Sequence, residues 1–554
     1  MATVRNDYFD DLEQIQPTLP EAGSRLGVVV GGSLSKGLVV KVDRMQRIED
    51  FAVGRYVVVR TESHKRFFCM VTDIALDNIN PAIQADPPDV SNPFLRAVHV
   101  GTTVFGKVSI QPMLMIDEES GEGPKPVKTI PGHFTDVHTA TASDVEAVFG
   151  QDDANHFPVG APLELETTSV NLNLDRLVQR SVGVFGKSGT GKSFFTRLLL
   201  GGVIKRQKAV TLIFDMHNDY GFAAGDERGA AVKGLKQLFP HDVAIATLDP
   251  EQANRRQTPR DLDVRICYDA IEPEDLVMLR ETMDFSDAMI DAAYTLRKRW
   301  GAKWIARLVH LSEADRLDVE EIPNLFEGTF NSLQRRIERF DRWGFLVPEV
   351  AEDSIQHIMH LLQQGKSVVL EFGKYGNSLE SYLFVANYIT RRIHMQYVEQ
   401  MEKALGNRND EPRQLMITIE EAHKFLAPAI ASQTIFGIIA RELRKYNVTL
   451  LVVDQRPSGI DEEVMSQIGT RITALLDNER DINAVLNGIS GGNSLREVLA
   501  RLDTQQQAII MGHAVPMPVV IRTRDYQSLV DEITGQAAAT PARRLPKPGP
   551  RRIG

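Results

Sequence analysis

The chain has 554 residues, which is too long for a single hydrophobic core and predicts about three domains. A hydrophobic content of 43%, a charged content of 25% and a formal net charge of −11 are typical of a globular protein. They exclude a uniformly basic surface, so any contact with nucleic acid needs a local basic patch.

The chain contains only two cysteines, Cys69 and Cys267, which excludes a disulfide framework and a cysteine-based metal site. The acidic N-terminus lacks the apolar core of a signal peptide, and apolar runs such as 450–453 are too short to span a bilayer. These features predict a cytoplasmic protein without membrane contact. Residues 1–22 are polar and are expected to form a flexible leader.

Residues 23–165 contain short β-rich runs separated by turn residues such as Gly31-Gly32, which predicts a small β-barrel or sandwich. The runs are 26–30, 38–42, 56–60, 67–74 and 97–110.

After residue 166, brief apolar runs alternate with helical spacing, which favours an α/β domain whose parallel sheet is covered on both faces. The expected strands are 182–185, 210–214, 243–248, 368–372, 416–419, 450–453 and 472–475. The strand pattern is interrupted over 266–364, where amphipathic segments such as 275–282 and 330–343 indicate a helical insertion. The α/β domain therefore comprises 166–265 and 365–530, and a disordered, basic, proline-rich tail is expected over 531–554.

The sequence GKSGTGKS at 186–193 follows an expected strand and precedes a helix-compatible stretch, which is the setting of a phosphate-binding loop. Successive backbone N–H groups then point at the phosphates of ATP, where the helix dipole favours negative charge. Lys192 reaches the β- and γ-phosphates, and the Ser193 hydroxyl ligates Mg²⁺. The expected nucleotide-binding residues are Gly186, Ser188, Gly189, Thr190, Gly191, Lys192, Ser193 and Phe194.

Two further strand ends carry acidic residues. The apolar run 416–419 ends in Glu420 and Glu421, of which the first is expected to hold Mg²⁺ and the second to polarise the attacking water. Two adjacent buried acids repel each other unless a cation is near, which favours this interpretation. Asp215, which ends the second strand, is expected to face the nucleotide together with His217 and Asp219, although a polar loop closed by an Asx turn is the alternative.

Downstream, Arg441 and Arg444 share one face of an expected helix. They form either a solvated basic face or a pair of arginine fingers that complete the site of a neighbouring subunit. Gln455 follows the expected strand 450–453, so its amide could sense the γ-phosphate or position water. The clusters Arg297-Lys298-Arg299 and Arg335-Arg336 with Arg339 form either a solvated helix face or a surface that grips DNA phosphates.

The order of these motifs resembles the HerA/FtsK superfamily of DNA-pumping ATPases, and its HerA branch most closely. The resemblance covers about residues 25–525 and is most specific in five segments. They are GKSGTGKS at 186–193, DMHNDY at 215–220, IEEAH at 419–423, ARELRKYNV at 440–448 and VDQRPS at 453–458.

The resemblance implies a RecA-like motor preceded by a small barrel, a homo-hexameric ring with ATP between subunits, and double-stranded DNA in the pore. It implies that Glu421 is the catalytic carboxylate, Gln455 the sensor and Arg180 a nucleotide contact, and that Arg441 and Arg444 act in trans. The sequence departs from the family pattern at Glu420, which replaces an aspartate, and at Asp454, which replaces a small hydroxyl residue.

The leading hypothesis is a double-stranded DNA translocase or helicase that hydrolyses ATP. The departures favour the motor of a bacterial antiphage defence complex with a nuclease or sirtuin-like effector over an end-resection helicase partnered with a NurA-type nuclease. A different class also remains open, in which the ring is an ATP-controlled scaffold that activates an effector with little unwinding. A GTPase is disfavoured because no N-K-x-D motif follows the acidic strand.

Overall fold

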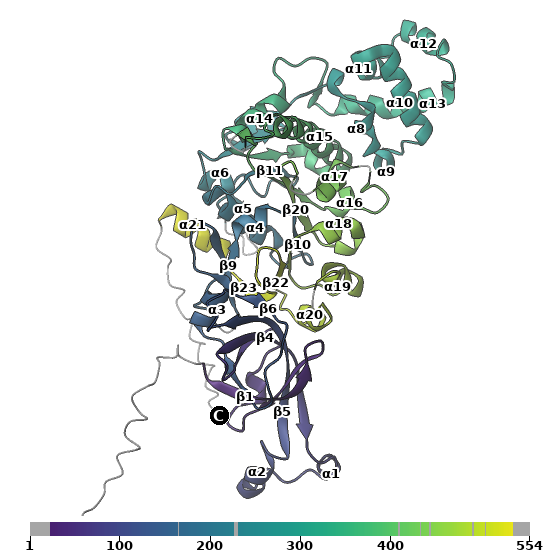
Figure 1. The fold of residues 1–554 in the computed structure, drawn as a ribbon. Helices are drawn as coiled ribbons and strands as arrows, with labels where there is room; N and C mark the ends of the chain where they lie inside the picture. The colour runs from purple at the N-terminus through teal and green to yellow at the C-terminus, as the bar shows by residue number, and fades with distance from the viewer. Residues whose placement is uncertain are drawn as a thin grey trace, which may run out of the picture.

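The computed structural model describes residues 23–163, 165–225, 231–407, 410–432, 434–442, 445–489, 492–504 and 506–535. The expected leader 1–22 lies outside these residues. Figure 1 shows three regions that follow one another along the molecule: a barrel, an α/β domain and a helical region.

The N-terminal region is a closed six-stranded barrel in the order β2-β1-β7-β3-β4-β5, and β2 also pairs with β5. This arrangement confirms the barrel predicted from the sequence. The barrel strands are β1 (Arg25–Ser33), β2 (Gly37–Val42), β3 (Tyr56–Arg60), β4 (Lys65–Asn78), β5 (Val104–Asp117) and β7 (Asp136–Thr139). A short strand, β6 (Lys125–Pro126), extends the sheet beyond β5, and three helices accompany it: α1 (Ala82–Ala85), α2 (Pro93–His99) and α3 (Ala142–Phe149).

Two details of this region differ from the sequence prediction. The expected strand 97–110 begins only at Val104, because Asn92 caps helix α2 and Pro93 occupies its first turn, so the chain stays helical through His99. The expected barrel range 23–165 also includes β8 (His156–Pro162), which pairs with strands of the large sheet instead.

The barrel packs directly on the α/β domain. Side chains alternate along β3, so Val57 and Val59 lie in the barrel core, whereas Tyr56 and Val58 join the core of the α/β domain. The Tyr56 hydroxyl donates to the Pro518 carbonyl at 2.8 Å and accepts the Val520 N–H at 3.2 Å. Contacts on both faces explain why residues 56–59 of this strand are all buried and lack charge.

A twelve-stranded sheet forms the α/β domain, in the order β15-β14-β18-β11-β19-β20-β10-β21-β22-β23-β8-β9. Its strands, in that order, are Leu262–Asp263, Val243–Thr247, Ser367–Glu371, Val210–Asp215, Leu415–Glu420, Val448–Asp454, Val182–Phe185, Thr470–Thr473, Gln507–Gly512, Val519–Thr523, His156–Pro162 and Val170–Asn173. All seven strands expected from the sequence are present and pair in parallel, whereas β22, β23, β8 and β9 add an antiparallel extension.

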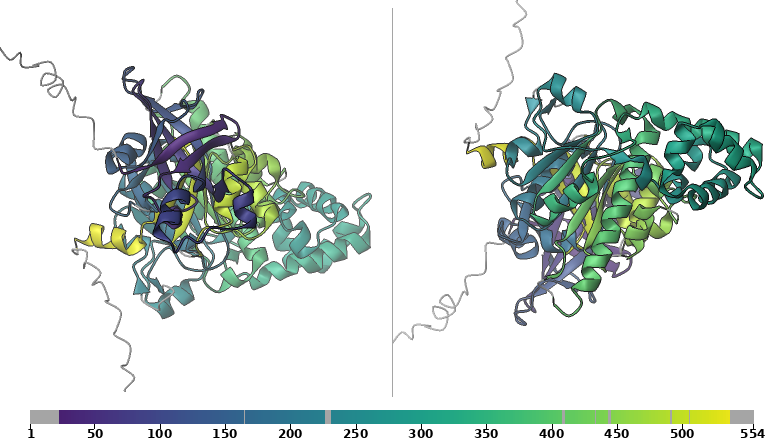
Figure 2. Two further views of the ribbon diagram at one scale, coloured as in Figure 1. Left: turned by 90° about the horizontal axis from the view of Figure 1, so that it is seen from below. Right: turned by 90° about the horizontal axis from the view of Figure 1, so that it is seen from above.

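Helices flank the sheet (Figures 1 and 2), and every residue of the central strands is buried because both faces are covered. These helices are α4 (Leu174–Val178), α5 (Lys192–Lys205), α6 (Leu235–Leu238), α7 (Pro250–Arg256), α14 (Ser354–Gln363), α15 (Leu379–Lys403), α16 (His423–Leu426), α17 (Ile435–Glu442), α18 (Glu462–Gln467), α19 (Glu479–Leu486), α20 (Gly492–Leu499) and α21 (Tyr526–Thr534). A small strand pair is formed by β12 (Ala224–Gly225) and β13 (Ala231–Val232).

The expected insertion is helical and projects to one side of the α/β domain (Figure 2). It contains α8 (Pro273–Val277), α9 (Arg280–Met283), α10 (Asp287–Trp300), α11 (Trp304–Val309), α12 (Glu313–Glu320) and α13 (Glu327–Ile337), with a short parallel pair β16 (Ile266–Cys267) and β17 (Leu346–Val347). Its base is fixed by Asp275, a fully buried carboxylate that binds Arg391 and Arg392 of α15 at 3.0 and 3.1 Å.

The expected tail, 531–554, overlaps the structured chain at its start. Residues 531–534 complete helix α21, whose C-terminal residue is followed by Gly535 in the left-handed conformation. The remainder, 536–554, lies outside the described residues. None of the helices that the structure describes is long and apolar enough to cross a membrane.

Candidate functional site

The glycine-rich segment forms a tight loop between β10 and α5. Gly189 and Gly191 adopt φ values of 79° and 85°, in the left-handed region where a side chain would be strained. Lys192 is the first residue of α5, so the loop ends at a helix N-terminus whose N–H groups can bind an anion. The strand–loop–helix order expected from the sequence is therefore present.

Lys192 is held over this loop. Its ammonium donates to the Lys187 carbonyl at 2.8 Å, a contact that a bound phosphate would replace. Burial lowers the pKa of Lys192, and the carboxylates of Glu421, Asp454 and Glu420 oppose that shift in this order. Lys192 is thus a positive group among the carboxylates of this pocket.

A pocket of about 280 Å³ lies beside the loop and contains most of the expected catalytic groups. Nine of the residues expected to bind nucleotide, hold metal or act in catalysis line it: Ser188, Gly189, Gly191, Lys192, Ser193, Phe194, Glu420, Glu421 and Gln455. His217, Asp219, Asp454 and Arg197 line it as well. Segments that lie more than 200 residues apart in sequence meet here because β10, β19 and β20 are neighbours in the sheet.

Glu420 is the last residue of β19 and is only 7% exposed. The buried Tyr220 hydroxyl donates to its Oε1 at 2.7 Å. Burial raises the pKa of Glu420 to about 7, and Asp215, Asp219 and Glu421 add to the rise, while the Tyr220 hydrogen bond opposes it. A nearby cation would therefore strongly stabilise the ionised form of Glu420.

Glu421 differs from Glu420 in both backbone and exposure. Its φ is 49°, an uncommon value for a residue with a side chain, and its side chain is 33% exposed. Gln455 donates from Nε2 to Glu421 Oε1 at 3.2 Å. The turn therefore directs Glu421 into the pocket while Glu420 stays buried, so the two adjacent acids can have different roles.

The residues present fit a magnesium ion bound together with a nucleotide. Ser193 offers a hydroxyl and Glu420 a carboxylate in the same pocket, and a divalent cation would offset the repulsion that raises the Glu420 pKa. Among the described residues, no group of three or more histidines, cysteines or acids could hold a metal alone. Phosphate oxygens and water would therefore supply most of the ligands.

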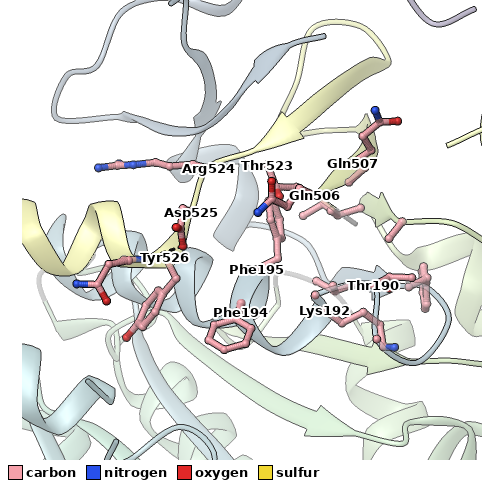
Figure 3. A pocket seen from close by; sticks show the side chains of 18 of the residues that line it. Thr190, Lys192, Phe194, Phe195, Gln506, Gln507, Thr523, Arg524, Asp525 and Tyr526 are labelled. Atoms are coloured by element: carbon pink, nitrogen blue, oxygen red, sulfur yellow. Dashed lines mark hydrogen bonds between the residues drawn. The ribbon is translucent and has the colours of Figure 1, made fainter. Parts of the chain in front are cut away.

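A second pocket of about 440 Å³ adjoins the loop on its other side (Figure 3). Thr190, Lys192 and Phe194 contribute from the loop and α5, while residues 506–508 and 523–527 contribute from β22, β23 and α21. The Tyr526 ring lies 6.5 Å from the Phe194 ring, measured between centroids. Sequence reasoning missed this pocket because the C-terminal segments carry no nucleotide-binding motif and reach the loop only through sheet pairing.

The Asp215 side chain does not face the pocket, contrary to what the sequence had predicted. It is fully buried, and its carboxylate accepts the backbone N–H groups of Asp219, Tyr220 and Gly221 at 2.7, 2.9 and 3.3 Å. Burial raises its pKa to about 6, and the pocket wall is supplied by His217 and Asp219 instead. The polar loop that the sequence left open is therefore found, but the Asp215 carboxylate closes it through N–H groups four to six residues on and not through an Asx turn.

Of the arginines expected to contact nucleotide, the two that the structure describes line neither pocket of their own chain. Arg180 precedes β10 and packs against Gly469, at the end of the strand opposite the phosphate loop. Arg441 on α17 pairs with Glu463 at 3.0 Å. Arg444 lies outside the described residues.

The basic clusters of the insertion are largely paired with acids. Arg297 makes two 2.7 Å hydrogen bonds to Glu272, and Arg299 lies 2.6 Å from Asp318. In the second cluster, Arg336 pairs with Asp284 at 2.6 Å. Neutralised arginines are poorly suited to grip phosphates, so the paired helix face is the better description of both clusters.

The fold and site together define a P-loop ATPase with a RecA-like sheet. Residues 157–393 match the family model described as "Helicase HerA, central domain". The chain is 23% identical to the DNA double-strand break repair helicase HerA of Pyrococcus furiosus over 71% of this chain and 73% of that protein. It is 22% identical to HerA of Saccharolobus solfataricus over 90% of this chain and 91% of that protein. The chain is thus an ATP-hydrolysing enzyme that is similar to HerA helicases.

Among solved structures, the chain is similar to VirB4 of Thermoanaerobacter pseudethanolicus, with 13% identity and a TM-score of 0.44 over 67% of this chain and 97% of that one. It is also similar to the plasmid coupling protein TrwB in complex with ADP and Mg²⁺, with 12% identity and a TM-score of 0.43 over 68% and 96% of the two chains.

Proposed function

We propose that this chain is an ATP-driven, double-stranded DNA translocase or helicase that works as a homo-oligomeric ring, hexameric in the expected form, in the cytoplasm. The observation that carries the proposal is the meeting of Lys192, Glu421 and Gln455 in one pocket beside a phosphate-binding loop. Relatives that the chain matches over 71% and 90% of its length are named DNA double-strand break repair helicases, which supports DNA as the substrate of the motor.

In this mechanism Lys192 leaves the Lys187 carbonyl and contacts the phosphates. Ser193 and Glu420 would hold Mg²⁺, which when bound would neutralise charge on the phosphates. Glu421 orients and polarises the attacking water, and Gln455, hydrogen-bonded to Glu421, senses whether the γ-phosphate is present. The nucleoside occupies the larger pocket beside Phe194 and Tyr526.

A second protomer is required for the arginines to act. Arg441 and Arg180 line neither pocket of their own chain, and Arg441 lies on α17, where it pairs with Glu463 and Asp461. In a ring, Arg441, Arg444 and Arg180 would reach the nucleotide bound by the neighbouring subunit. An arginine supplied in trans stabilises the charge that develops on the transferred phosphate.

Subunit mixing tests the shared site. Lys192→Ala removes the phosphate contact, and the double variant Arg441→Ala/Arg444→Ala removes the trans arginines, so each protein alone should lose DNA-stimulated ATP hydrolysis. Mixed rings contain interfaces that combine an intact phosphate loop with intact arginines, so mixing should restore part of the activity. A mixture as inactive as its components, or a wild-type chain that stays monomeric with ATP and DNA, would contradict the ring.

We further propose that the ring is the motor of a bacterial antiphage defence complex with a nuclease or sirtuin-like effector. The support is the pair Glu420-Glu421 and Asp454 at positions where the resembling family carries other residues. Phage challenge of cells that express this chain with the protein encoded beside it tests the setting. Protection that is lost with Lys192→Ala supports an ATP-dependent role in defence. Strand displacement or translocation by the wild type then supports the motor, whereas effector activation without either favours the scaffold.

A further inference from the structure

Arg197 is a buried arginine on α5, the helix that follows the phosphate loop. It is 2% exposed, yet among the described residues no group accepts a hydrogen bond from its Nε or Nη1. Oδ1 of Asp219 lies 4.0 Å from Nη2, which is too far for a hydrogen bond. Because a buried guanidinium normally donates hydrogen bonds to oxygen atoms, the position of this side chain requires another explanation.

Three aromatic rings lie within cation–π distance of the guanidinium. Its central carbon lies 4.9 Å from the centroid of the Phe194 ring and 6.0 Å from the centroids of the Tyr220 and Tyr526 rings. A guanidinium over a ring face is attracted to the π electrons, and the attraction is stronger where water is excluded. The rings are therefore the partners of this charge, and they come from three segments: α5, the loop after β11 and the start of α21.

Two of these rings belong to the larger pocket. Phe194 and Tyr526 both line it (Figure 3), and the Tyr526 hydroxyl is fixed by donating to the Lys233 carbonyl at 3.1 Å. Arg197 contacts both rings but borders the smaller pocket and not the larger one. A nucleoside in the larger pocket would therefore touch the rings and not the guanidinium.

We propose that Arg197 is a positioning residue that holds the rings of Phe194 and Tyr526 as the surface on which the nucleoside of ATP binds. The inference rests on the proposed function, in which the larger pocket takes the nucleoside. Phe194 is only partly buried, so packing alone leaves its ring some freedom, and a cation over its face limits that freedom. A surface that is ordered before binding loses less entropy when the ligand arrives, which raises the affinity for the nucleoside.

Equilibrium binding to the full-length chain tests this role with two ligands, Mg-ATP and Mg-tripolyphosphate, of which the second has the phosphates but no nucleoside. Arg197→Met removes the charge and keeps a long side chain that still packs on aromatic rings. It should weaken ATP binding by about three- to tenfold and change the Kd of tripolyphosphate by less than about twofold. Arg197→Lys keeps a cation and should recover part of the ATP affinity.

A residue that acts through the two rings should have no effect once they are gone. The double variant Phe194→Leu/Tyr526→Leu keeps apolar volume and removes both ring faces, so adding Arg197→Met to it should weaken ATP binding no further. Arg307→Met is the matched control. Arg307 lies 5.5 Å from the Trp300 ring in the insertion and lines neither nucleotide pocket, so the loss of its charge should leave both affinities unchanged.

The two ligands separate the possible failures. Equal losses of affinity for ATP and tripolyphosphate in Arg197→Met would overturn the positioning role, and an accompanying fall in Tm would assign the arginine to the fold instead of to the phosphates. Wild-type affinity for ATP in Arg197→Met would overturn the role as well. A Lys192→Ala protein that binds both ligands as the wild type does would overturn the proposed nucleotide site, and this inference with it.

Discussion

The edge of the large sheet that faces the phosphate loop has two unlike halves. On one side, four neighbouring strands, β18, β11, β19 and β20, end in a carboxylate: Glu371, Asp215, Glu420 and Asp454. On the other side, β21, β22 and β23 bring the neutral residues Thr473, Gln507 and Thr523 to the same region. We call these the acidic half and the neutral half.

We infer that the acidic half carries out hydrolysis, whereas the neutral half recognises the nucleoside. In the acidic half, burial and mutual repulsion raise the pKa values of Asp215, Glu371 and Glu420 to between about 6 and about 7, so this half needs cations. In the proposed mechanism, Lys192 and a magnesium ion bound with ATP would meet that need. The neutral half, with Phe194 and Tyr526, offers aromatic and apolar surface that suits an uncharged nucleoside.

The largest effect is expected from Lys192→Ala, which removes the fixed cation of the acidic half. We expect kcat/KM for ATP to fall by at least about 100- to 1000-fold, because a preorganised charge at a reacting phosphate is lost. Lys205→Ala, at the other end of α5, is the control and should retain activity, since Lys205 pairs with Glu532 away from both pockets. Hydrolysis assays with double-stranded DNA measure both. Normal activity of Lys192→Ala would contradict the assignment of hydrolysis to the acidic half.

A smaller effect, on affinity, is expected in the neutral half. Tyr526→Ala should weaken ATP binding by about tenfold, the worth of one lost aromatic contact, with kcat within about twofold of wild type. Titration with a fluorescent ATP analogue measures the Kd. Tyr526→Phe keeps the ring and loses only the hydroxyl bond to the Lys233 carbonyl, so it should bind normally. A fall in kcat instead of affinity would place chemistry in the neutral half.

Stability should depend on pH through the acidic half. Burial, with Asp215 nearby, raises the pKa of Glu371 from 4.5 to about 7, so between these values the folded protein binds a proton that the unfolded chain does not. The free energy of unfolding therefore falls as pH rises through this window. Glu371→Gln should flatten that fall and raise stability at pH 8 by about 1–2 kcal/mol, with little change at pH 4. Urea unfolding at several pH values measures it.

The exposed Glu62 provides the control for that experiment. Glu62→Gln should leave the pH dependence of unfolding unchanged. Asp215 and Glu420 keep raised pKa values in the Glu371→Gln protein, so a reduced slope is expected rather than a flat profile. If Glu371→Gln leaves the pH dependence of the free energy of unfolding unaltered, ionisation of Glu371 does not destabilise the folded protein.

The acidic half was largely predictable from sequence, and the neutral half was not. The phosphate loop and Glu420-Glu421 are local patterns, in which strand, turn and chemistry lie within about ten residues. Asp215 was located correctly at a strand end, but its direction depends on the N–H groups of the loop that follows, which compete for its carboxylate. The neutral half forms only when β22 and β23 pair beside β21, a long-range event that leaves no local motif.

The smallest effect is expected for DNA binding by the insertion, because its arginines are paired with acids. Arg299 lies 2.6 Å from Asp318, so Arg299→Ala should change the Kd for double-stranded DNA by less than about twofold and leave its salt dependence intact. Asp318→Ala is the sharper variant, because it leaves Arg299 with the more distant Glu321, at 3.6 Å, and should tighten binding if DNA passes this surface. Weakening of about tenfold by Arg299→Ala would mean that the arginine leaves its acid for a phosphate. The insertion would then join the DNA path despite its paired charges.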